Sequence, residues 1–243
     1  MSGHSKWATI KHKKAKDDAV RGKIFTKIGR EIAVAVKEGG SDPNSNSRLR
    51  DAISKAKSNN MPNDGISRAI KKASGDLSSV NYESITYEGY GPNGTAFIVE
   101  TLTDNKNRTA GDIRHYFDKS GGSLGQIGCV SYMFDRKGVI EISNEKLEED
   151  DAFMIAVDAG AEDVISTEES YLIYTEVSNF SSVLANIEKA GLEILESNLE
   201  YIPQNVLYID NESQIKRITK LIDTLEEMDD VQNLHYNVEL VEG

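Results

Sequence analysis

The sequence is poor in the residues that build disulfide frameworks and metal sites. Its 243 residues include one cysteine, Cys129, and four scattered histidines, His4, His12, His115 and His235. A single cysteine cannot form an internal disulfide, and no Cys/His spacing matches a zinc module. Because apolar residues flank Cys129, we interpret it as a small buried side chain without chemistry. We expect no metal and no cofactor.

Long hydrophobic runs are also missing. The longest apolar stretch near the start, residues 32–36, is far shorter than the ~18 residues that span a bilayer, and the N-terminus has no hydrophobic run of a signal peptide. With 4 prolines, 38% hydrophobic and 28% charged residues, the composition is typical of a globular protein. We expect a cytoplasmic protein without a membrane partner.

Motifs of enzymes are absent or incomplete. The glycine pattern at 89–94 matches a dinucleotide fingerprint, but a strand follows it where the fingerprint needs a helix, which favours a turn. Gly22-Lys23 lacks the rest of a phosphate-binding loop, and the acidic runs at 148–151 and 226–230 are typical of solvated surface. No Ser/His/Asp or Cys/His set can be assembled. We expect that the protein is not an enzyme.

Two interpretations remain open for the glycine-rich segment 121–125. Its glycines could point successive N–H groups at one anion, with the polar segment 104–108 nearby. It could equally form a turn from a helix into a strand, which is the interpretation we favour.

Charge is distributed very unevenly. The chain has 28 Lys/Arg and 40 Asp/Glu, a net charge of −12. Residues 1–76 contain 17 Lys/Arg and 8 Asp/Glu, a net charge of +9, so the remainder carries −21. A basic module gains free energy on a phosphate backbone by releasing counterions, whereas an acidic body is repelled. This predicts a nucleic-acid partner, although the basic segment could instead pack against the acidic remainder.

Apolar spacing predicts a helical bundle in residues 1–76. A first helix at 17–38 has one apolar stripe, and most of its cations lie opposite, although Glu31 intrudes on the apolar side. Helices at 45–58 and 63–74 follow, and Arg68, Lys71 and Lys72 lie away from the apolar stripe of the third. The three helices predict a small bundle with a basic outer surface.

After residue 76 the apolar period changes from helical to strand-like. Strands at 82–88 and 95–103 read as a hairpin, a capping box predicts a helix at 109–119, and a strand follows at 128–134. Residues 138–202 then read as strand 138–142, helix 145–159, strand 161–166, strand 171–176, helix 181–190 and strand 193–201. Strand 205–209, helix 212–228 and strand 231–241 end the chain.

This order predicts an α+β protein of three domains. Residues 1–76 form the basic helical bundle with an N-terminal arm, and residues 137–202 form a ferredoxin-like βαββαβ domain. The latter is inserted into a discontinuous α/β domain, residues 77–136 and 203–243, whose segments repeat the ferredoxin-like order.

The basic arm combines point charges for phosphates with an aromatic face for base stacking. Its single aromatic, Trp7, could alternatively anchor the arm on the bundle. The predicted nucleic-acid-binding residues are Lys6, Trp7, Lys11, His12, Lys13, Lys14, Lys16, Arg21, Lys23, Lys27, Arg30, Arg68, Lys71 and Lys72.

Several motifs together resemble the YebC/PmpR family, relatives of a mitochondrial translational activator. They are GHSKWATIKHKK at 3–14, RGKIFTK at 21–27, NMP at 60–62, YEGYGP at 87–92 and GGSLG at 121–125. Thr9 stands where the family pattern has Asn, which leaves the charge pattern intact. The resemblance implies a three-domain, cytoplasmic, non-enzymatic protein that acts in gene expression.

The resemblance implies two activities, since some members are labelled DNA-binding transcriptional regulators and others look like ribosome-associated factors that help translation through proline runs. We favour ribosomal RNA, because a thin basic arm with one stackable aromatic suits an RNA cavity and no helix presents a row of base-reading side chains. The alternatives are a DNA-binding transcriptional regulator and a protein adaptor that works through the acidic domains. The sequence indicates no oligomeric state.

Overall fold

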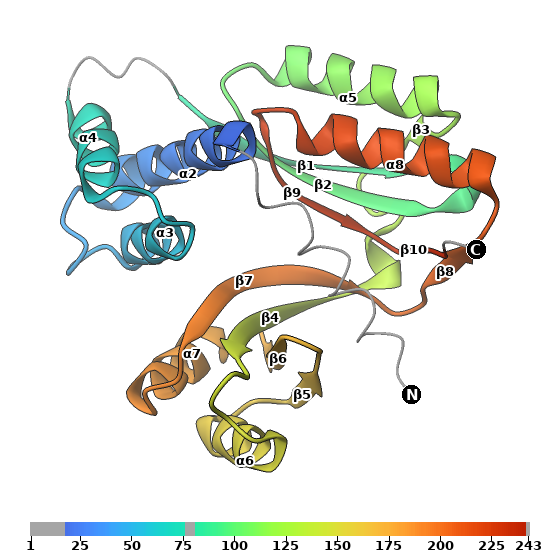
Figure 1. Cartoon of the computed structure of the whole chain (residues 1–243). Coiled ribbons are helices and arrows are strands. Elements are labelled where there is room, and N and C mark those ends of the chain that lie inside the picture. The colour runs from blue at the N-terminus through green and yellow to red at the C-terminus, as the bar shows by residue number, and fades with distance from the viewer. Residues whose placement is uncertain (1–17, 76–80, 242–243) are drawn as a thin grey trace. The chain divides into compact units, whose positions relative to one another are not determined.

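The computed structural model describes residues 18–75 and 81–241 and has the expected α+β architecture (Figure 1). Among these residues, 18–75, 81–133 and 205–241 belong to one compact unit, and 134–204 form the other. No helix of the described part is long and apolar enough to cross a bilayer.

The N-terminal helices are α2 (Asp18–Gly39), α3 (Ser47–Ser58) and α4 (Asn63–Ser74). They pack around their own hydrophobic core, which includes Ile32, Leu49 and Ile66. Helix α3 begins two residues later than predicted because Asn46 caps it. The Asn46 side chain accepts from the Leu49 N–H at 3.0 Å and donates to the Ala35 carbonyl at 2.7 Å, so it also ties α3 to α2.

Glu31, which interrupts the apolar stripe of α2, has a partner on α3. Lys55 Nζ lies 2.8 Å from Glu31 Oε1, and both side chains are about a quarter exposed (24% and 22%). The intrusion is therefore an ion pair between two helices of the bundle. Lys55 is therefore not one of the exposed cations of α3.

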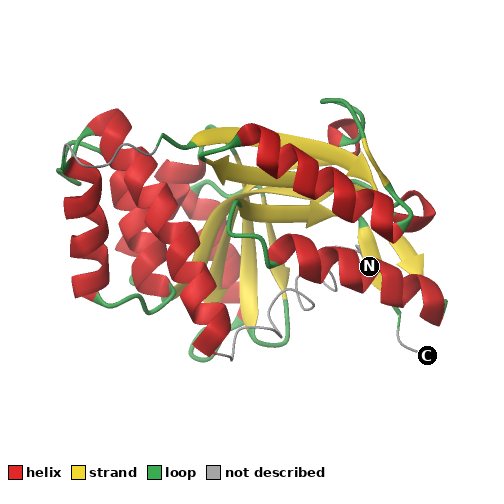
Figure 2. Cartoon of the chain, turned by 90° about the horizontal axis from the view of Figure 1, so that it is seen from above, coloured by secondary structure: helices red, strands yellow, loops and turns green. Residues whose placement is uncertain are grey.

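A four-stranded antiparallel sheet follows, in the order β3-β1-β2-β9. Its strands are β1 (Glu83–Tyr90), β2 (Ala96–Thr103), β3 (Ser123–Leu124) and β9 (Val231–Tyr236). Helices α5 (Lys106–Ser120) and α8 (Glu212–Glu226) lie side by side on it (Figures 1 and 2). Phe97, Val99, Phe117 and Leu221 fill the core between helices and sheet.

The order of this sheet differs from the ferredoxin-like order predicted for the discontinuous domain, in which strand 205–209 takes part. Strand β8 (Leu207–Ile209) does not join it but pairs in parallel with β10 (Val238–Leu240), and β1 occupies the place between β2 and β3. The hairpin of β1 and β2 explains the difference. The short 3-10 turn η2 (Pro92–Gly94) connects the two strands, so β1 pairs directly with β2. The predicted strand 231–241 is likewise interrupted at Asn237, whose side-chain oxygen accepts from the Ala96 N–H at 2.7 Å.

Helix α5 begins at Lys106, three residues before the predicted start at Thr109. The cap is Asn105, whose side chain accepts from the Arg108 N–H at 3.1 Å. Thr109 is instead buried within the helix, and its hydroxyl donates to Asp230 at 2.7 Å. The capping box at Thr109 was therefore a wrong prediction.

The predicted strand 128–134 is also wrong. Residues 128–130 form a loop, Ser131–Met133 form the 3-10 turn η3, and β4 starts at Phe134. The reason is a buried carboxylate, because Glu88 accepts from the N–H groups of Gly128, Val130 and Ser131 at 2.8, 2.9 and 2.9 Å. These N–H groups are consequently unavailable for a strand ladder.

The segment 121–125 forms the turn that we favoured. Gly121 ends α5 with a φ of 83°, the left-handed region that suits glycine. A Cβ on Gly122 would lie 2.4 Å from the Tyr90 carbonyl oxygen, so only glycine lets β3 approach β1 at this point.

The second unit has the βαββαβ order that the sequence predicts. It consists of β4 (Phe134–Ser143), α6 (Glu149–Ala159), β5 (Asp163–Ser166), β6 (Ser170–Glu176), α7 (Phe180–Lys189) and β7 (Ile194–Pro203). The antiparallel sheet runs β5-β6-β4-β7 around a core that includes Ile140, Ile173 and Ile187. Because Phe134 pairs with Pro203, the two ends of the unit are neighbours in one ladder.

Candidate nucleic-acid interface

The predicted nucleic-acid-binding residues fall into three groups. Lys6, Trp7, Lys11, His12, Lys13, Lys14 and Lys16 lie outside the described residues. Arg21, Lys23, Lys27 and Arg30 belong to α2, and Arg68, Lys71 and Lys72 belong to α4.

Lys23 and Lys27 lie on the side of α2 that meets the C-terminal end of α8. Lys27 Nζ donates to the Glu226 carbonyl at 2.9 Å, and Lys23 Nζ lies 3.8 Å from Glu227 Oε1. Burial lowers the pKa of Lys27, although nearby Glu226 and Asp229 oppose the shift. These two lysines therefore engage acidic residues of their own chain.

Arg30 takes part in a cluster around Asp230, which we call the Asp230 cluster: Arg30, Thr103, Arg108, Thr109 and Asp230. Arg30 Nη1 lies 2.5 Å from one carboxylate oxygen of Asp230, and Arg108 Nη2 lies 2.9 Å from the other. The Thr109 and Thr103 hydroxyls lie 2.7 and 3.3 Å from that second oxygen. The cluster joins the helical bundle to the α/β domain.

The surroundings of Asp230 favour the charged form of its carboxyl group. Burial by itself would raise the pKa of this carboxyl group, but hydrogen bonds from Thr109, Arg108 and Arg30 outweigh it and lower the pKa to about 2. Arg30 also donates to the Leu102 carbonyl at 3.0 Å. With its side chain 15% exposed, Arg30 serves an internal contact between domains.

The cations of α4 have a different environment. Arg68, Lys71 and Lys72 are exposed and share one helix face because they are three and four residues apart. Arg68 Nε donates to the Asp64 carbonyl at 3.1 Å within the same helix. We call these three residues the α4 row.

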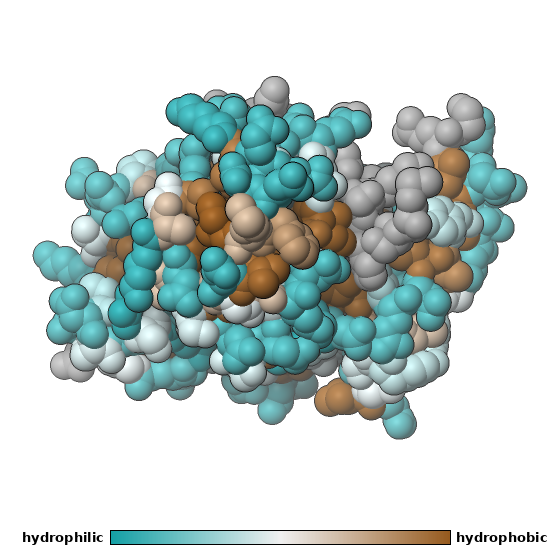
Figure 3. Space-filling model, turned by 90° about the horizontal axis from the view of Figure 1, so that it is seen from below, coloured by the Kyte–Doolittle hydropathy of each residue, from teal (hydrophilic) through white to brown (hydrophobic). Residues whose placement is uncertain are grey.

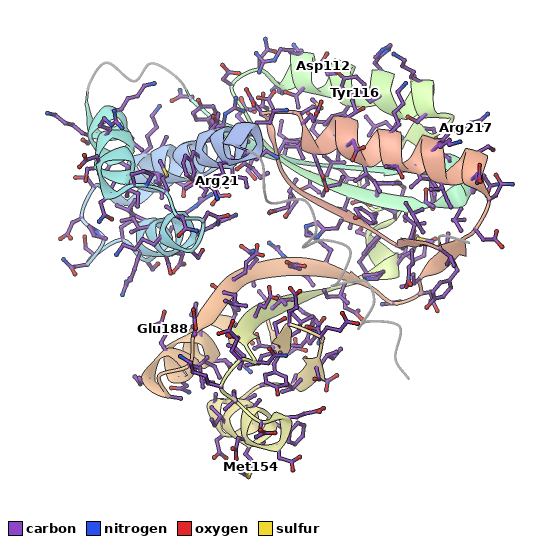
Figure 4. The ribbon with its side chains drawn as sticks, in the orientation of Figure 1. Arg21, Asp112, Tyr116, Met154, Glu188 and Arg217 are labelled. Atoms are coloured by element: carbon purple, nitrogen blue, oxygen red, sulfur yellow. The ribbon has the colours of Figure 1, made fainter. Side chains whose placement is uncertain are left out.

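Sequence reasoning missed two exposed cations of α3, Arg50 and Lys57. They are seven residues apart and therefore lie on one face of the helix, and this spacing is visible in the sequence. Arg48, by contrast, pairs with Glu38. Arg21 is exposed on α2 (Figure 4).

These exposed cations suit the binding of phosphates. The face of α3 with Arg50 and Lys57 has Ser54 between them, and Ser67 lies beside the α4 row. Such rows fit contacts to a nucleic-acid backbone. In the described parts of the chain, no three His, Cys, Asp or Glu side chains come together to hold a metal ion.

Two family models match the chain. One, described as the TACO1/YebC protein N-terminal domain, matches residues 5–76, and the other, described as the TACO1/YebC second and third domain, matches residues 82–238. The chain belongs to the TACO1/YebC family. The first match covers the α2–α4 bundle of this family member, and the second covers all of unit 134–204 together with nearly all of the α/β domain.

Other proteins are similar to the chain over nearly its full length. A protein of Acetivibrio thermocellus is 56% identical over 238 residues, 98% of each chain, and one of Thermoanaerobacter pseudethanolicus is 56% identical over 241 residues, 99% of this chain and 98% of that one. Both are named probable transcriptional regulatory proteins. The crystal structure of a conserved hypothetical protein from Aquifex aeolicus is 46% identical, covers 98% of each chain and has a TM-score of 0.87.

Proposed function

We propose that the chain is a non-enzymatic, nucleic-acid-binding regulator of gene expression whose bundle and N-terminal arm grip a phosphate backbone. The α4 row carries this proposal, because its three exposed cations share one face and contact no carboxylate of the chain in the part that the structure describes. Arg50 and Lys57 of α3 add to it. The names of the relatives, which describe regulatory proteins, support the same function.

The charge of the unit 134–204 supports the assignment of nucleic-acid binding to the bundle. It carries 17 Asp/Glu and 4 Lys/Arg, a net charge of −13. A nucleic acid attracts the bundle and repels this unit, so the charge pattern favours contact through the bundle.

Within this function we favour ribosomal RNA as the target. The rows on α3 and α4 supply cations for phosphates, and the basic arm adds Trp7, whose ring can stack on an unpaired base. The second candidate is a DNA-binding transcriptional regulator, which the names of the relatives favour.

Binding to nucleic acid at several salt concentrations tests the shared part of the proposal. The variant Arg68→Glu/Lys71→Glu/Lys72→Glu removes the α4 row, and Lys216→Glu/Arg217→Glu/Lys220→Glu makes the same charge change on exposed positions of α8 (Figure 4). We expect the α4 variant to bind more weakly and its salt slope to fall by roughly 0.7–0.9 per lost phosphate contact, while the α8 variant follows the wild type. Equal losses in both variants would show that only net charge matters.

Sedimentation of a cell lysate through a gradient at physiological salt separates the two targets. We expect the wild-type protein to migrate with ribosomes, whereas Lys13→Glu/Lys14→Glu leaves those fractions, and a nuclease-treated lysate serves as the control. If the wild type avoids ribosomes and the purified protein protects a specific DNA duplex, the transcriptional regulator becomes the correct description.

A further inference from the structure

Helix α6 presents apolar side chains to solvent. Phe153, Met154 and Val157 are 53%, 59% and 50% exposed, whereas Ala152 and Ala156 on the opposite side are buried in the domain core. Residues 153 and 157 are four apart, and residue 154 lies next to them on the helix surface. Figure 4 shows Met154 projecting away from the sheet of its domain. We call Phe153, Met154 and Val157 the α6 face.

The α6 face is concentrated on one short helix. The other large apolar side chains exposed in the described residues lie singly or in pairs on other elements, such as Ile127 and Tyr208. The view from below in Figure 3 shows apolar atoms gathered among hydrophilic ones on the side where Figure 1 draws α6. Single exposed apolar residues are normal, but a contiguous apolar face is typical of an interaction site.

Carboxylates border the α6 face. Glu149, Asp150 and Asp151 form the first turn of the helix, and Asp158 lies in its last turn. All four are exposed, and none forms an ion pair within the described residues. The acidic first turn stabilises the helix dipole, but Asp158 opposes it at the C-terminal end. Helix stability therefore does not account for Asp158.

We propose that the α6 face docks an amphipathic protein segment that combines apolar anchors with flanking Lys or Arg residues. The apolar anchors cover Phe153, Met154 and Val157, and the cations meet Asp151 and Asp158 beside them. This proposal is independent of the nucleic-acid function, because a different unit and opposite charge carry it.

Charge also decides against other occupants. Two copies joined through their α6 faces would bring like carboxylates together, and nucleic acid or an anionic lipid surface would be repelled by a unit of net charge −13. The bundle of a second copy offers cations, but residues 21–75 contribute no exposed large apolar side chain to pair with Phe153. A basic amphipathic segment matches both the apolar side chains of the α6 face and the carboxylates that border it.

Titration of the full-length protein with a synthetic helical peptide of Leu and Lys in amphipathic order tests this proposal. The variant Phe153→Ser/Met154→Ser/Val157→Ser removes the apolar anchors without changing charge, and Ile127→Ser/Tyr208→Ser removes exposed apolar side chains elsewhere. We expect the first variant to bind at least about tenfold more weakly and the second to bind like the wild type.

A charge variant and a scrambled peptide distinguish specific docking from nonspecific attraction. Asp151→Asn/Asp158→Asn should weaken binding and flatten its dependence on salt, and a peptide of the same composition in scrambled order should bind the wild type more weakly. Equal binding of the scrambled peptide, or of the triple serine variant, would overturn the proposal in favour of nonspecific attraction. Self-association of the wild type that the triple serine variant abolishes would instead assign the face to a second copy.

Discussion

At the scale of single residues, Asp230 gathers contacts from three segments of the chain. Arg30 reaches it from α2, Arg108 and Thr109 reach it from α5, and Thr103 reaches it from the end of β2. The carboxylate is buried, and its side chain is 8% exposed, so it cannot exchange these partners for water. Removal of its charge should therefore loosen the contact between the bundle and the α/β domain.

We expect Asp230→Asn to lower the free energy of unfolding at pH 7 by about 2–3 kcal/mol, mainly because Arg30 loses its buried partner. Urea unfolding at several pH values measures this loss. The folded pKa of Asp230, about 2, lies below its ordinary 3.8, so the advantage of the wild type is present above pH ~4 and disappears as the pH falls towards 2. Asp104→Asn, which removes an exposed partner of Arg108, should cost less than about 1 kcal/mol. Identical curves for Asp230→Asn and the wild type would refute the structural role.

A second carboxylate, Glu88, holds the loop that precedes η3. Burial alone would raise its pKa, but the N–H groups of Gly128, Val130 and Ser131 lower it, so the charged form is the one that the loop requires. We expect Glu88→Gln to accelerate hydrogen exchange at these amides by at least about tenfold, because charge-assisted hydrogen bonds become neutral ones. Exchange monitored by NMR measures this. The control Glu83→Gln, on an exposed position of the same strand, should leave those amides unchanged.

At the scale of elements, glycine positions decide how closely strands approach. A Cβ at residue 122 would collide with the Tyr90 carbonyl oxygen, whereas nothing lies within 4 Å of a Cβ at residue 111 in α5. We expect Gly122→Ala to destabilise the protein by about 1–3 kcal/mol and Gly111→Ala to stabilise it by about 0.5–1 kcal/mol. Thermal unfolding of both variants compares them, and equal shifts would contradict the packing argument.

The elements also show how far sequence reasoning reaches. Helix α4 has the bounds that its apolar period predicts, because that period depends only on local spacing. The strand predicted at 128–134 is absent, because Glu88, forty residues earlier, withdraws the N–H groups that a strand would need. The sheet contains β1 where the sequence predicts β8, and the origin is similar. Strand pairing joins segments that are far apart in the chain, and local spacing gives no information about which of them pair.

At the scale of the whole molecule, the inserted unit 134–204 enters and leaves the rest of the chain at neighbouring residues. Phe134 and Pro203 are partners in one ladder, and residues 134–204 have their own core. We expect a chain in which a short turn replaces 135–202 to fold and to keep its binding of nucleic acid, because the cores of the bundle and the α/β domain remain. Circular dichroism and the salt-dependent binding assay test this. Loss of folding in the shortened chain would show that the units stabilise each other.

The sequence by itself determined the basic and acidic parts, the helical bundle, the βαββαβ order of the insertion and the resemblance to the family, because these depend on composition, local period and motifs. Only the tertiary structure decided which of the basic side chains contact distant parts of the chain and which stay exposed. Lys23, Lys27, Arg30, Arg68 and Lys71 look alike in the sequence, yet the first three contact acidic residues or carbonyl groups distant in the chain. The α4 row remains exposed because no such partner folds against it in the described structure.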